Sequence, residues 1–226
     1  MSLRVCLFDI DGTLLTSGGA GQVGMERALS EVFGITNHDV DIPAAGRTDR
    51  AITADLFRHH GIDLHEANIA SFLAAYDRHL PDALATCRGL VYPGIEPLLN
   101  ELSNLSGVVL GLLTGNYRVG ADHKLRHYKL NQHFGFGGFG DHHENRDDVA
   151  RAAMQSLHDT GHGDVDLEHV WVIGDTPADV RCARAIGAKV VAVATGIFSA
   201  DELEQSKPDH LFQDFSNFQQ FLALLD

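Results

Sequence analysis

The sequence predicts an α/β protein in which a parallel sheet is covered by helices on both faces. Two observations support this prediction. Short apolar segments of strand length recur along the chain, and each is followed by glycine or by polar residues. Segments of helical length separate them, so that strand and helix alternate. Such alternation is typical of right-handed crossover connections, which join parallel strands and place helices against the sheet.

The predicted strands are continuous apolar runs, as expected of strands that are buried on both faces. In chain order they are Val5–Phe8, Val108–Leu113, Val170–Ile173 and Lys189–Val193. Polar residues follow these runs, namely Asp9, Thr114, Asp175 and Thr195. Because ligands bind at the carboxyl ends of the strands in such sheets, we expect these side chains to converge on one site.

Helices are expected between the strands and at the end of the chain. They are Gly94–Ser103, Arg118–Lys129, Arg146–Leu157, Pro177–Ile186 and an amphipathic closing helix over Phe215–Leu225. The glycine-rich segment Phe134–Gly140 is expected to contain a further strand and its exit. It does not indicate a nucleotide-binding loop, because no GK[ST] follows it.

The region between residues 18 and 88 departs from this alternation. Helical patterns cover Gln22–Phe33, Asp49–His60 and His65–His79, and no convincing strand lies among them. We therefore expect a small α-helical domain inserted after the first strand.

The expected division places residues 1–16 and 89–226 in the α/β core and residues 17–88 in the helical insert. Glycines at Ser17–Gly21 and the stretch Pro81–Pro93 mark the joints. Two interpretations of these joints stay open. They are either hinges that let the insert move over the sheet edge, or plain loops.

Composition excludes several classes of function. The chain has 17 basic and 31 acidic residues, a net charge of −14, and such a surface repels nucleic-acid phosphates. Its apolar stretches are too short to span a bilayer and its start lacks a signal-peptide pattern, so we expect a cytoplasmic protein without membrane association. Three widely spaced cysteines without a CxxC pair predict neither a disulfide framework nor a zinc site.

The segment Asp9-Ile10-Asp11-Gly12-Thr13 directly follows the first strand. In extended backbone, residues i and i+2 lie on the same side, so both carboxylates can face one site. Asp9 could attack phosphorus to form an aspartyl-phosphate, and Asp11 could protonate the leaving alcohol and then activate water. Gly12 permits a tight turn, and Thr13 offers its hydroxyl or N–H to a phosphate. The alternative is that both carboxylates are turn or cap residues.

A metal is expected beside this pair, because two carboxylates and an anionic phosphoryl group repel one another unless a divalent cation lies among them. Mg²⁺ prefers oxygen ligands and retains waters. The expected ligands are Asp9, the backbone carbonyl of Asp11, and Asp175 or Asp179. The last two lie four residues apart at another junction between strand and helix, which favours metal binding over simple capping.

A phosphate-binding segment is expected at Thr114-Gly115-Asn116, which follows the strand Val108–Leu113. It offers a hydroxyl and backbone N–H groups at the N-terminus of the next helix. A strand followed by threonine and glycine is also a common helix entry, so this signal is weak by itself.

A positive side chain is needed to hold the charge of the nucleophile and of the phosphoryl oxygens. Arg146 and Lys124 compete for this role. Arg146 opens the helix before the Asp175 strand, whereas Lys124 lies two turns down a helix among solvated neighbours. We therefore favour Arg146. Its alternative is a solvated arginine that pairs with the neighbouring acidic residues Asp147 and Asp148.

These four segments, in this order, resemble the motifs of the haloacid dehalogenase superfamily over essentially the whole chain. DIDGTL matches the first motif, LLTGN the second and GDTPAD the fourth, while Arg146 stands where the third motif usually has lysine. The resemblance implies a Rossmann-like sheet and a helical cap of the first type. Dehalogenases lack the second acid and phosphonatases typically replace it with alanine, so Asp11 indicates phosphate chemistry. Phosphoglycolate phosphatase-like hydrolases and β-phosphoglucomutase-like mutases share these features.

Substrate choice is expected to lie in the insert, where Gly46-Arg47-Thr48-Asp49-Arg50 forms a polar break between two helices. Arg47 or Arg50 would bind a carboxylate or a second phosphate of the substrate. The alternative is that Asp49 caps the next helix and both arginines face water.

Together these patterns predict a Mg²⁺-dependent phosphatase that acts on a small phosphorylated metabolite through an aspartyl-phosphate. Two alternatives stay open: an intramolecular phosphotransferase of the phosphoglucomutase type, and a non-catalytic module that senses phosphate or metal. The sequence identifies neither the metabolite nor the oligomeric state.

Overall fold

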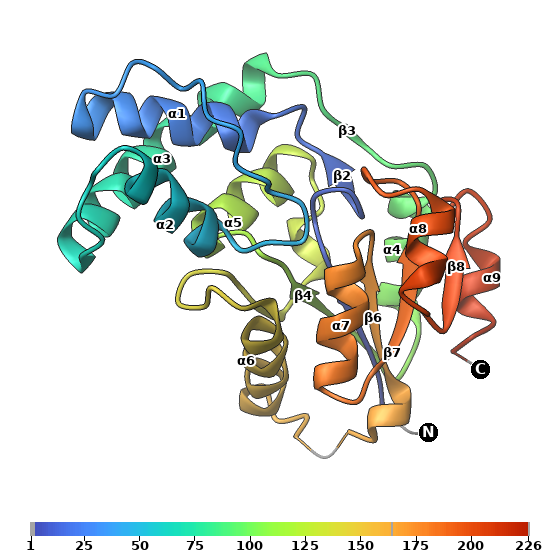
Figure 1. Cartoon of the computed structure of the whole chain (residues 1–226). Helices are drawn as coiled ribbons and strands as arrows, with labels where there is room; N and C mark the ends of the chain where they lie inside the picture. The colour runs from blue at the N-terminus through green and yellow to red at the C-terminus, as the bar shows by residue number, and fades with distance from the viewer. Residues whose placement is uncertain (1–2, 164, 226) are drawn as a thin grey trace.

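The computed structural model describes residues 3–163 and 165–225. Within them, six parallel strands form one sheet in the order β5-β4-β1-β6-β7-β8 (Figure 1). The strands are β1 (Arg4–Phe8), β4 (Val108–Leu113), β5 (Phe136–Gly138), β6 (Val170–Gly174), β7 (Lys189–Val193) and β8 (His210–Phe212). The predicted parallel sheet is confirmed. Residues 1, 2, 164 and 226, which the predicted core includes, lie outside the described residues.

Strand β1 lies at the centre of the sheet, and its alternate side chains enter two separate hydrophobic layers. Cys6 and Phe8 pack in one layer, and Val5 and Leu7 pack in the other. The first layer is covered by α4 (Ile95–Asn104), α5 (Arg118–His127) and the C-terminal α9 (Gln219–Leu222). The second is covered by α6 (Arg146–Asp159) and α7 (Pro177–Ala185). Burial on both faces explains why the strands read as continuous apolar runs.

The helical insert consists of α1 (Ala20–Phe33), α2 (Asp49–His59) and α3 (Glu66–Thr86). Its core contains the fully buried rings of Phe57, Phe72 and Tyr76. The rings of Phe57 and Phe72 meet edge to face, and those of Phe72 and Tyr76 are stacked. The three helices lie beyond the carboxyl ends of β1 and β4 (Figure 1). The insert therefore covers the sheet edge at which the polar strand ends meet. The bounds suggested for it, residues 17–88, stay a prediction.

Several short elements were not predicted. The chain enters and leaves the insert through an antiparallel pair, β2 (Leu15–Thr16) and β3 (Leu90–Val91). Helix α8 (Ala200–Gln205) and the 3₁₀ turns η1 (Asn131–His133) and η2 (Leu167–His169) complete the described elements. Strands of two or three residues are too short to show a period-two pattern, which explains why β2, β3 and β8 escape sequence analysis.

Two predicted helices have different lengths from those expected. Helix α3 continues through Pro81 to Thr86, because Leu80, Ala83 and Leu84 lie buried against the rest of the insert and offset the lost backbone hydrogen bond. The closing helix is shorter than Phe215–Leu225. Only Gln219–Leu222 is helical, and Phe215 is buried in the core without being part of a helix. None of the described helices is long and apolar enough to cross a membrane.

Candidate active site

The carboxyl ends of β1, β4 and β6 meet at the centre of the sheet. Asp9 follows β1, Thr114 follows β4 and Asp175 lies just past β6. Strand β1 pairs with β4 on one side and with β6 on the other, so these three ends are direct neighbours. All three side chains are buried. The convergence of polar residues that the sequence predicts is therefore present at this edge.

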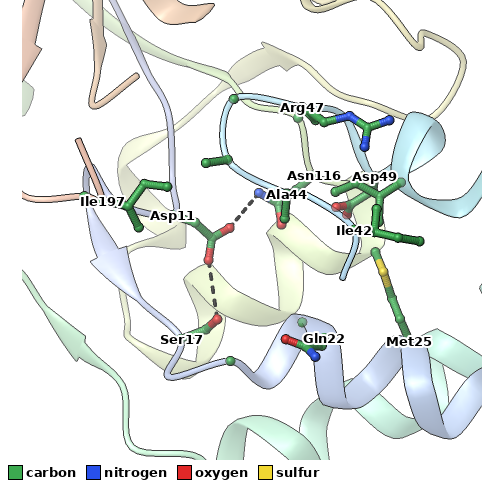
Figure 2. A pocket seen from close by; sticks show the side chains of 18 of the residues that line it. Asp11, Ser17, Gln22, Met25, Ile42, Ala44, Arg47, Asp49, Asn116 and Ile197 are labelled. Carbon is green, nitrogen blue, oxygen red and sulfur yellow. Dashed lines mark hydrogen bonds between the residues drawn. The ribbon is translucent and has the colours of Figure 1, made fainter. Parts of the chain in front are cut away.

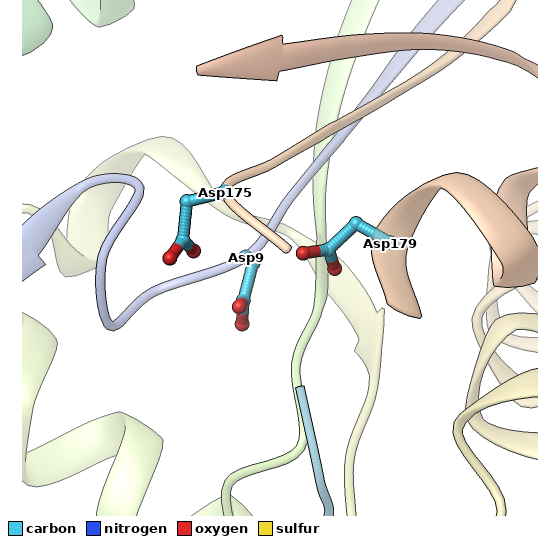
Figure 3. A group of neighbouring side chains, drawn as sticks. All are labelled: Asp9, Asp175 and Asp179. Atoms are coloured by element: carbon cyan, nitrogen blue, oxygen red, sulfur yellow. The ribbon is translucent and has the colours of Figure 1, made fainter. Parts of the chain in front are cut away.

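Three carboxylates form a buried cluster at this point. One carboxylate oxygen from each of Asp9, Asp175 and Asp179 lies within 4.8 Å of the other two, and Figure 3 shows the three side chains together. Asp179 comes from the first turn of α7, where it forms a capping box with Thr176. One Asp179 oxygen accepts from the Thr176 N–H at 2.9 Å and from its hydroxyl at 2.8 Å. Asp179 thus caps α7 and also faces the cluster.

Arg146 lies between two members of this cluster. The Asn145 side chain caps α6 and makes Arg146 its first residue, which directs the guanidinium to the strand ends. Arg146 Nη2 lies 2.8 Å from Asp9 and 2.5 Å from Asp179. Burial alone would lower the pKa of Arg146, but the Asp179 and Asp9 carboxylates outweigh burial and raise it. Arg146 is therefore a permanent cation beside Asp9.

One arginine does not balance three buried carboxylates. Burial, Asp179 and Asp9 raise the pKa of Asp175 to about 8, and burial is also the main cause of the raised pKa of Asp9. The Asp175 carboxylate accepts one hydrogen bond, from the Thr13 hydroxyl at 2.9 Å. A cluster of oxygen ligands with excess negative charge fits a hard divalent cation such as Mg²⁺. The oxygens of Asp9 and Asp175 are more available to a cation than those of Asp179, because both Asp179 oxygens already accept hydrogen bonds, one from Arg146 and one from Thr176.

Lys124 also reaches the site, contrary to the interpretation that it lies among solvated neighbours. Its Nζ is 2.5 Å from Asp11 Oδ2 and 2.6 Å from Asn116 Oδ1, and its side chain is 6% exposed. The buried face of α5 carries Gly120, Ala121, Lys124 and Leu125. That spacing is the stripe of a core-facing helix, and the apolar stem of the lysine lies along it. The same spacing in the sequence could have revealed Lys124.

The two cations therefore occupy different places. Arg146 contacts Asp9, and Lys124 contacts Asp11. Burial tends to raise the pKa of Asp11, but Lys124, Asn116 and Ser17 together lower it below its usual value. Burial tends to lower the pKa of Lys124, but Asp11 and Asp49 raise it overall.

The turn after β1 fits closely against Asp175. Gly12 has φ of +85°, and a Cβ there would lie 2.2 Å from Asp175 Oδ2, so both backbone conformation and space require glycine. The Thr13 hydroxyl donates to Asp175 and its N–H to the Ile10 carbonyl, which occupies both groups that the sequence offered to a phosphate. In this structure Thr13 orients Asp175.

The predicted phosphate-binding segment lies beside Asp11. Asn116 Nδ2 donates to Asp11 Oδ2 and to the Thr114 hydroxyl, each at 2.8 Å. Gly115 approaches the insert so closely that a Cβ would lie 2.0 Å from the Arg47 carbonyl oxygen. Glycine at this position lets the insert and the core touch.

The insert is fastened to the core at the start of α2. The Asp49 N–H donates to the Gly115 carbonyl at 2.7 Å, and Asp49 Oδ2 accepts from the Tyr117 N–H at 2.8 Å. Thr48, not Asp49, caps α2, because the Thr48 hydroxyl accepts from the Ala51 N–H. Burial is the main cause that raises the pKa of Asp49 to about 6. Asp49 thus joins the two parts of the chain.

Both insert arginines that were candidate substrate ligands already have acidic partners. Arg47 Nη2 lies 2.6 Å from Asp55, and its guanidinium points away from Asp11 (Figure 2). Arg50 lies 3.0 Å from Glu66 and is not among the residues that line the cavity. The role of either arginine in binding substrate stays a prediction.

A cavity of about 600 Å³ separates the insert from the strand ends. Its core wall includes Asp9, Asp11, Asn116, Arg146 and Asp175. Its insert wall comes from α1, α2 and the connection between them. Figure 2 shows Asp11 bonded to Ser17 and Asn116 on one side of this space, and Ile42 and Met25 on the other.

Residues 6–193 match the family model of the haloacid dehalogenase-like hydrolases. The chain belongs to this family. The resemblance seen in the sequence motifs is confirmed, and so is the expectation that the protein is a hydrolase.

Curated relatives and solved structures agree with this placement. The chain is 27% identical to a phosphoglycolate phosphatase of Rhodospirillum rubrum, with 97% of the chain and 91% of the relative covered. It is 23% identical to the pyrophosphatase PpaX of Oceanobacillus iheyensis, with 96% and 95% covered. CbbY from Rhodobacter sphaeroides, solved in complex with phosphate, matches with a TM-score of 0.75 at 20% identity over 96% of each chain. A hydrolase from Pseudomonas syringae matches with a TM-score of 0.70 at 18% identity, covering 97% and 98%.

Three residues of this hydrolase's site were not predicted from the sequence. Ser17 donates to Asp11, Asp49 joins the insert to the core, and Gly196 faces Asp175 so closely that a Cβ would lie 1.7 Å from Oδ2. Asp49 lies in the segment predicted as a polar break between two helices, and Ser17 lies in the glycine-rich joint predicted at the start of the insert. Gly196 lies shortly after β7, next to Thr195, whose hydroxyl donates to the Gly12 carbonyl. The position of Gly196 after a predicted strand is the feature of the sequence that could have identified it.

Proposed function

We propose that this hydrolase is a Mg²⁺-dependent phosphatase that transfers the phosphoryl group of a small phosphorylated metabolite to Asp9 and then to water. The observation that carries the proposal is the pairing of Asp9 with Arg146 and of Asp11 with Lys124 at one strand end. This arrangement provides a nucleophile, an acid–base group and two cations. The phosphatase names of the two relatives support the same reaction class.

The chemistry requires two displacements at phosphorus. In the first, an Asp9 oxygen bonds to phosphorus while the bond to the leaving alcohol breaks. The pKa of Asp11 is low while Lys124 pairs with it, and an anionic phosphoryl group that takes over this contact would raise it, so that Asp11 gives the alkoxide its proton. In the second, Asp11 takes a proton from water, the water oxygen bonds to phosphorus, and Asp9 is released. Both steps require an acid–base group close to the nucleophile, and Asp11 lies only two residues from Asp9 in the chain.

The residues around Asp9 serve charge and position. Arg146 contacts the Asp9 carboxylate, and Lys124 lies where it would meet a phosphoryl oxygen beside Asp11. Asp9, Asp175 and the Asp11 backbone carbonyl would hold Mg²⁺, which would supply charge neutralisation. Asp179 would hold Arg146 and the start of α7 in place beside it. Because these groups are buried and mutually bonded, they need little reorganisation when charge develops.

The intramolecular phosphotransferase alternative receives no comparable support. Such an enzyme needs a second site for an anionic phosphate. Among the described residues, every lysine and arginine that lines the cavity already contacts a carboxylate.

The experiment that tests the proposal is release of inorganic phosphate from p-nitrophenyl phosphate by the purified chain. We expect release that requires Mg²⁺, stops on addition of EDTA and returns with excess Mg²⁺. Asp9→Asn should abolish it. Asp159→Asn, which changes an exposed residue of α6, is the matched control and should retain wild-type turnover. Unchanged turnover in Asp9→Asn would rule out Asp9 as the nucleophile.

A further inference from the structure

The positive charges in the cavity are already neutralised. Among the described residues, Arg47, Lys124 and Arg146 are the arginines and lysines in its lining. Arg47 lies 2.6 Å from Asp55, Lys124 lies 2.5 Å from Asp11, and Arg146 contacts Asp9 and Asp179. Lys124 and Arg146 belong to the end where phosphoryl transfer takes place. On the insert side only Arg47 remains, and its guanidinium also donates to the Pro43 and Ala51 carbonyls.

The insert instead adds negative charge. Glu26, Asp41 and Asp49 line the cavity from the insert side. Glu26 accepts a hydrogen bond from the Gln22 amide, Asp41 is exposed, and Asp49 accepts from the Tyr117 N–H. A carboxylate or second phosphate on the leaving group would meet these groups without a free cation to compensate. Burying such a charge without a partner is strongly unfavourable.

Six large apolar side chains form part of the insert wall. They are Met25 and Leu29 of α1, Val40 and Ile42 of the connection to α2, and Ile52 and Leu56 of α2. Ile197, 78% exposed on the core, lines the cavity opposite them. In Figure 2 the Met25 and Ile42 side chains lie next to each other, across the space from Asp11 and Ile197. An apolar wall of this extent favours a leaving group with a hydrocarbon body.

Three residues of this wall carry a buried polar atom that has no hydrogen-bond partner among the described residues. These atoms are His38 Nδ1, His60 Nε2 and the Tyr76 hydroxyl, and all three residues line the cavity. The Ser30 hydroxyl lies 2.7 Å from the Ile35 carbonyl and 3.0 Å from His38 Nε2. The Glu26 carbonyl is a second acceptor at 3.0 Å from the same hydroxyl. Because two carbonyls compete for the hydroxyl hydrogen, we assign the histidine proton to Nε2, which leaves Nδ1 as an acceptor. A hydroxyl group on the leaving alcohol would satisfy it.

From these observations we infer that the substrate is a phosphate monoester whose leaving alcohol is uncharged, largely apolar and able to donate a hydrogen bond to His38. This inference rests on the proposed function and specifies its substrate class. It departs from the sequence prediction that Arg47 or Arg50 binds a second acidic group. A cationic leaving group is disfavoured because Glu26 and Asp49 each already accept a hydrogen bond and Asp41 is exposed to water, so the cation would lose hydration without a buried carboxylate free to pair with it.

Three aryl phosphates test the inference, because they differ only in one distal group. They are 4-(hydroxymethyl)phenyl, 4-(carboxymethyl)phenyl and 4-(aminomethyl)phenyl phosphate. In each, a methylene separates the distal group from the ring, which keeps the leaving phenols similar in acidity. We expect the wild-type kcat/KM for the hydroxymethyl ester to exceed that for either charged ester by at least about tenfold, since unpaired charge in the cavity is penalised.

A variant with an added cation makes the test specific to the insert wall. Ile42 is half-buried in a loop that lines the cavity and packs against the edge of the insert core, so Ile42→Lys places an ammonium group there without removing a fully buried side chain. It should raise kcat/KM for the carboxymethyl ester and reduce the discrimination against it by about tenfold, as expected of one new charge pair. Leu64→Lys is the matched control. Leu64 is 47% exposed, lies in the insert outside the cavity lining, and should leave the ratio unchanged.

The outcomes separate the two proposals. Equal or faster turnover of the carboxymethyl ester by the wild type would overturn the inference while phosphatase activity stands, and so would a preference for the aminomethyl ester. If the wild type releases phosphate from none of the three esters and none from p-nitrophenyl phosphate, the proposed function itself fails. Hydrolysis of the hydroxymethyl ester by Ile42→Lys reports that this variant is folded.

Discussion

The two walls of the cavity differ in how their charges are held. On the core wall, Asp9, Lys124, Arg146 and Asp175 are buried and bonded to one another or to their neighbours. On the insert wall the one arginine, Arg47, and its partner Asp55 are each about one third exposed in the described structure. Removing a partner from a buried pair costs about 3–5 kcal/mol, whereas an exposed pair contributes about 0–1 kcal/mol.

This difference indicates that the core wall carries the catalytic groups and that the insert wall influences which substrate binds. The core wall is built from strand ends and first helical turns, which are fixed by the sheet and leave little freedom to a side chain. The insert wall is built from apolar and polar side chains of the insert helices and of the 15-residue connection between α1 and α2. A change on the core wall is therefore expected to affect catalysis, and a change on the insert wall to affect which substrate binds or how the insert docks.

The largest effect expected beyond the nucleophile is that of Asp11→Asn. The variant keeps the size of the side chain and a contact with Lys124, but it can neither donate the carboxylic acid proton nor accept one from water. We expect kcat to fall by about 10²–10⁴-fold, the usual contribution of a general acid–base group. Steady-state phosphate release measures it. Asp122→Asn, an exposed residue of α5 paired with Arg126, is the control and should behave as wild type.

A smaller loss is expected when the two walls are forced apart. In Gly115→Ala the new Cβ would meet the Arg47 carbonyl oxygen at 2.0 Å, so the start of α2 has to move away from the core. A misplacement of about 1 Å can reduce activity by about 10²-fold, and we expect a loss of that order in kcat/KM. Gly135→Ala is the matched control, because nothing lies within 4 Å of its Cβ position. Similar kinetics for both variants would show that contact between insert and core is dispensable.

The third prediction concerns pH and stability at the contact between the walls. The folded state raises the pKa of Asp49 from 3.8 to about 6, so it binds this proton more tightly than the unfolded state does. Stability therefore falls as pH rises from about 4 to 6, and the cost is fully present above pH 6. Asp49→Asn keeps an acceptor for the Tyr117 N–H and removes that cost. It should be more stable than wild type at pH 8 by at most about 3 kcal/mol, with the gain shrinking towards pH 4.

Urea unfolding at pH 8 and at pH 4.5 measures this difference. Asp55→Asn serves as a control of opposite sign, because hydrogen bonds from Arg47 and Arg58 lower the pKa of Asp55 in the folded state. It should lose stability at pH 8 relative to wild type. A destabilised Asp49→Asn at pH 8 would mean that the Asp49 carboxylate is favourably held.

The smallest effect is expected for Arg50→Ala. Arg50 pairs with Glu66, whose side chain is 85% exposed, and it lies outside the cavity lining. We expect the free energy of unfolding to change by less than about 1 kcal/mol and kcat/KM to remain within about twofold of wild type. A large increase in KM would instead show that Arg50 binds substrate, as the sequence suggested. The insert would then contribute a charged substrate ligand, and the two walls would differ less than we infer.

Much of the fold could be predicted because hydrophobic patterning is a local property of the chain. The strands Val108–Leu113 and Lys189–Val193 have the predicted bounds, and the helices of the insert begin within two residues of their predicted starts. The pair β2 and β3 could not be predicted, because two residues carry no periodic pattern. It depends on a partner about 75 residues away in the chain.

The sequence by itself determined the order of strands and helices and the polar residues at the strand ends. These features depend on residue type and short spacing. The prediction of phosphate chemistry at Asp11 came from the resemblance of its motif to those of the family. Only the tertiary structure decided that Lys124 contacts Asp11, that Asp179 bonds to both Arg146 and Thr176, and that Arg47 is paired with Asp55. Such contacts depend on how far each side chain reaches and on which groups surround it after packing. The burial and pairing of charge, and with them the character of each cavity wall, exist only in the folded chain.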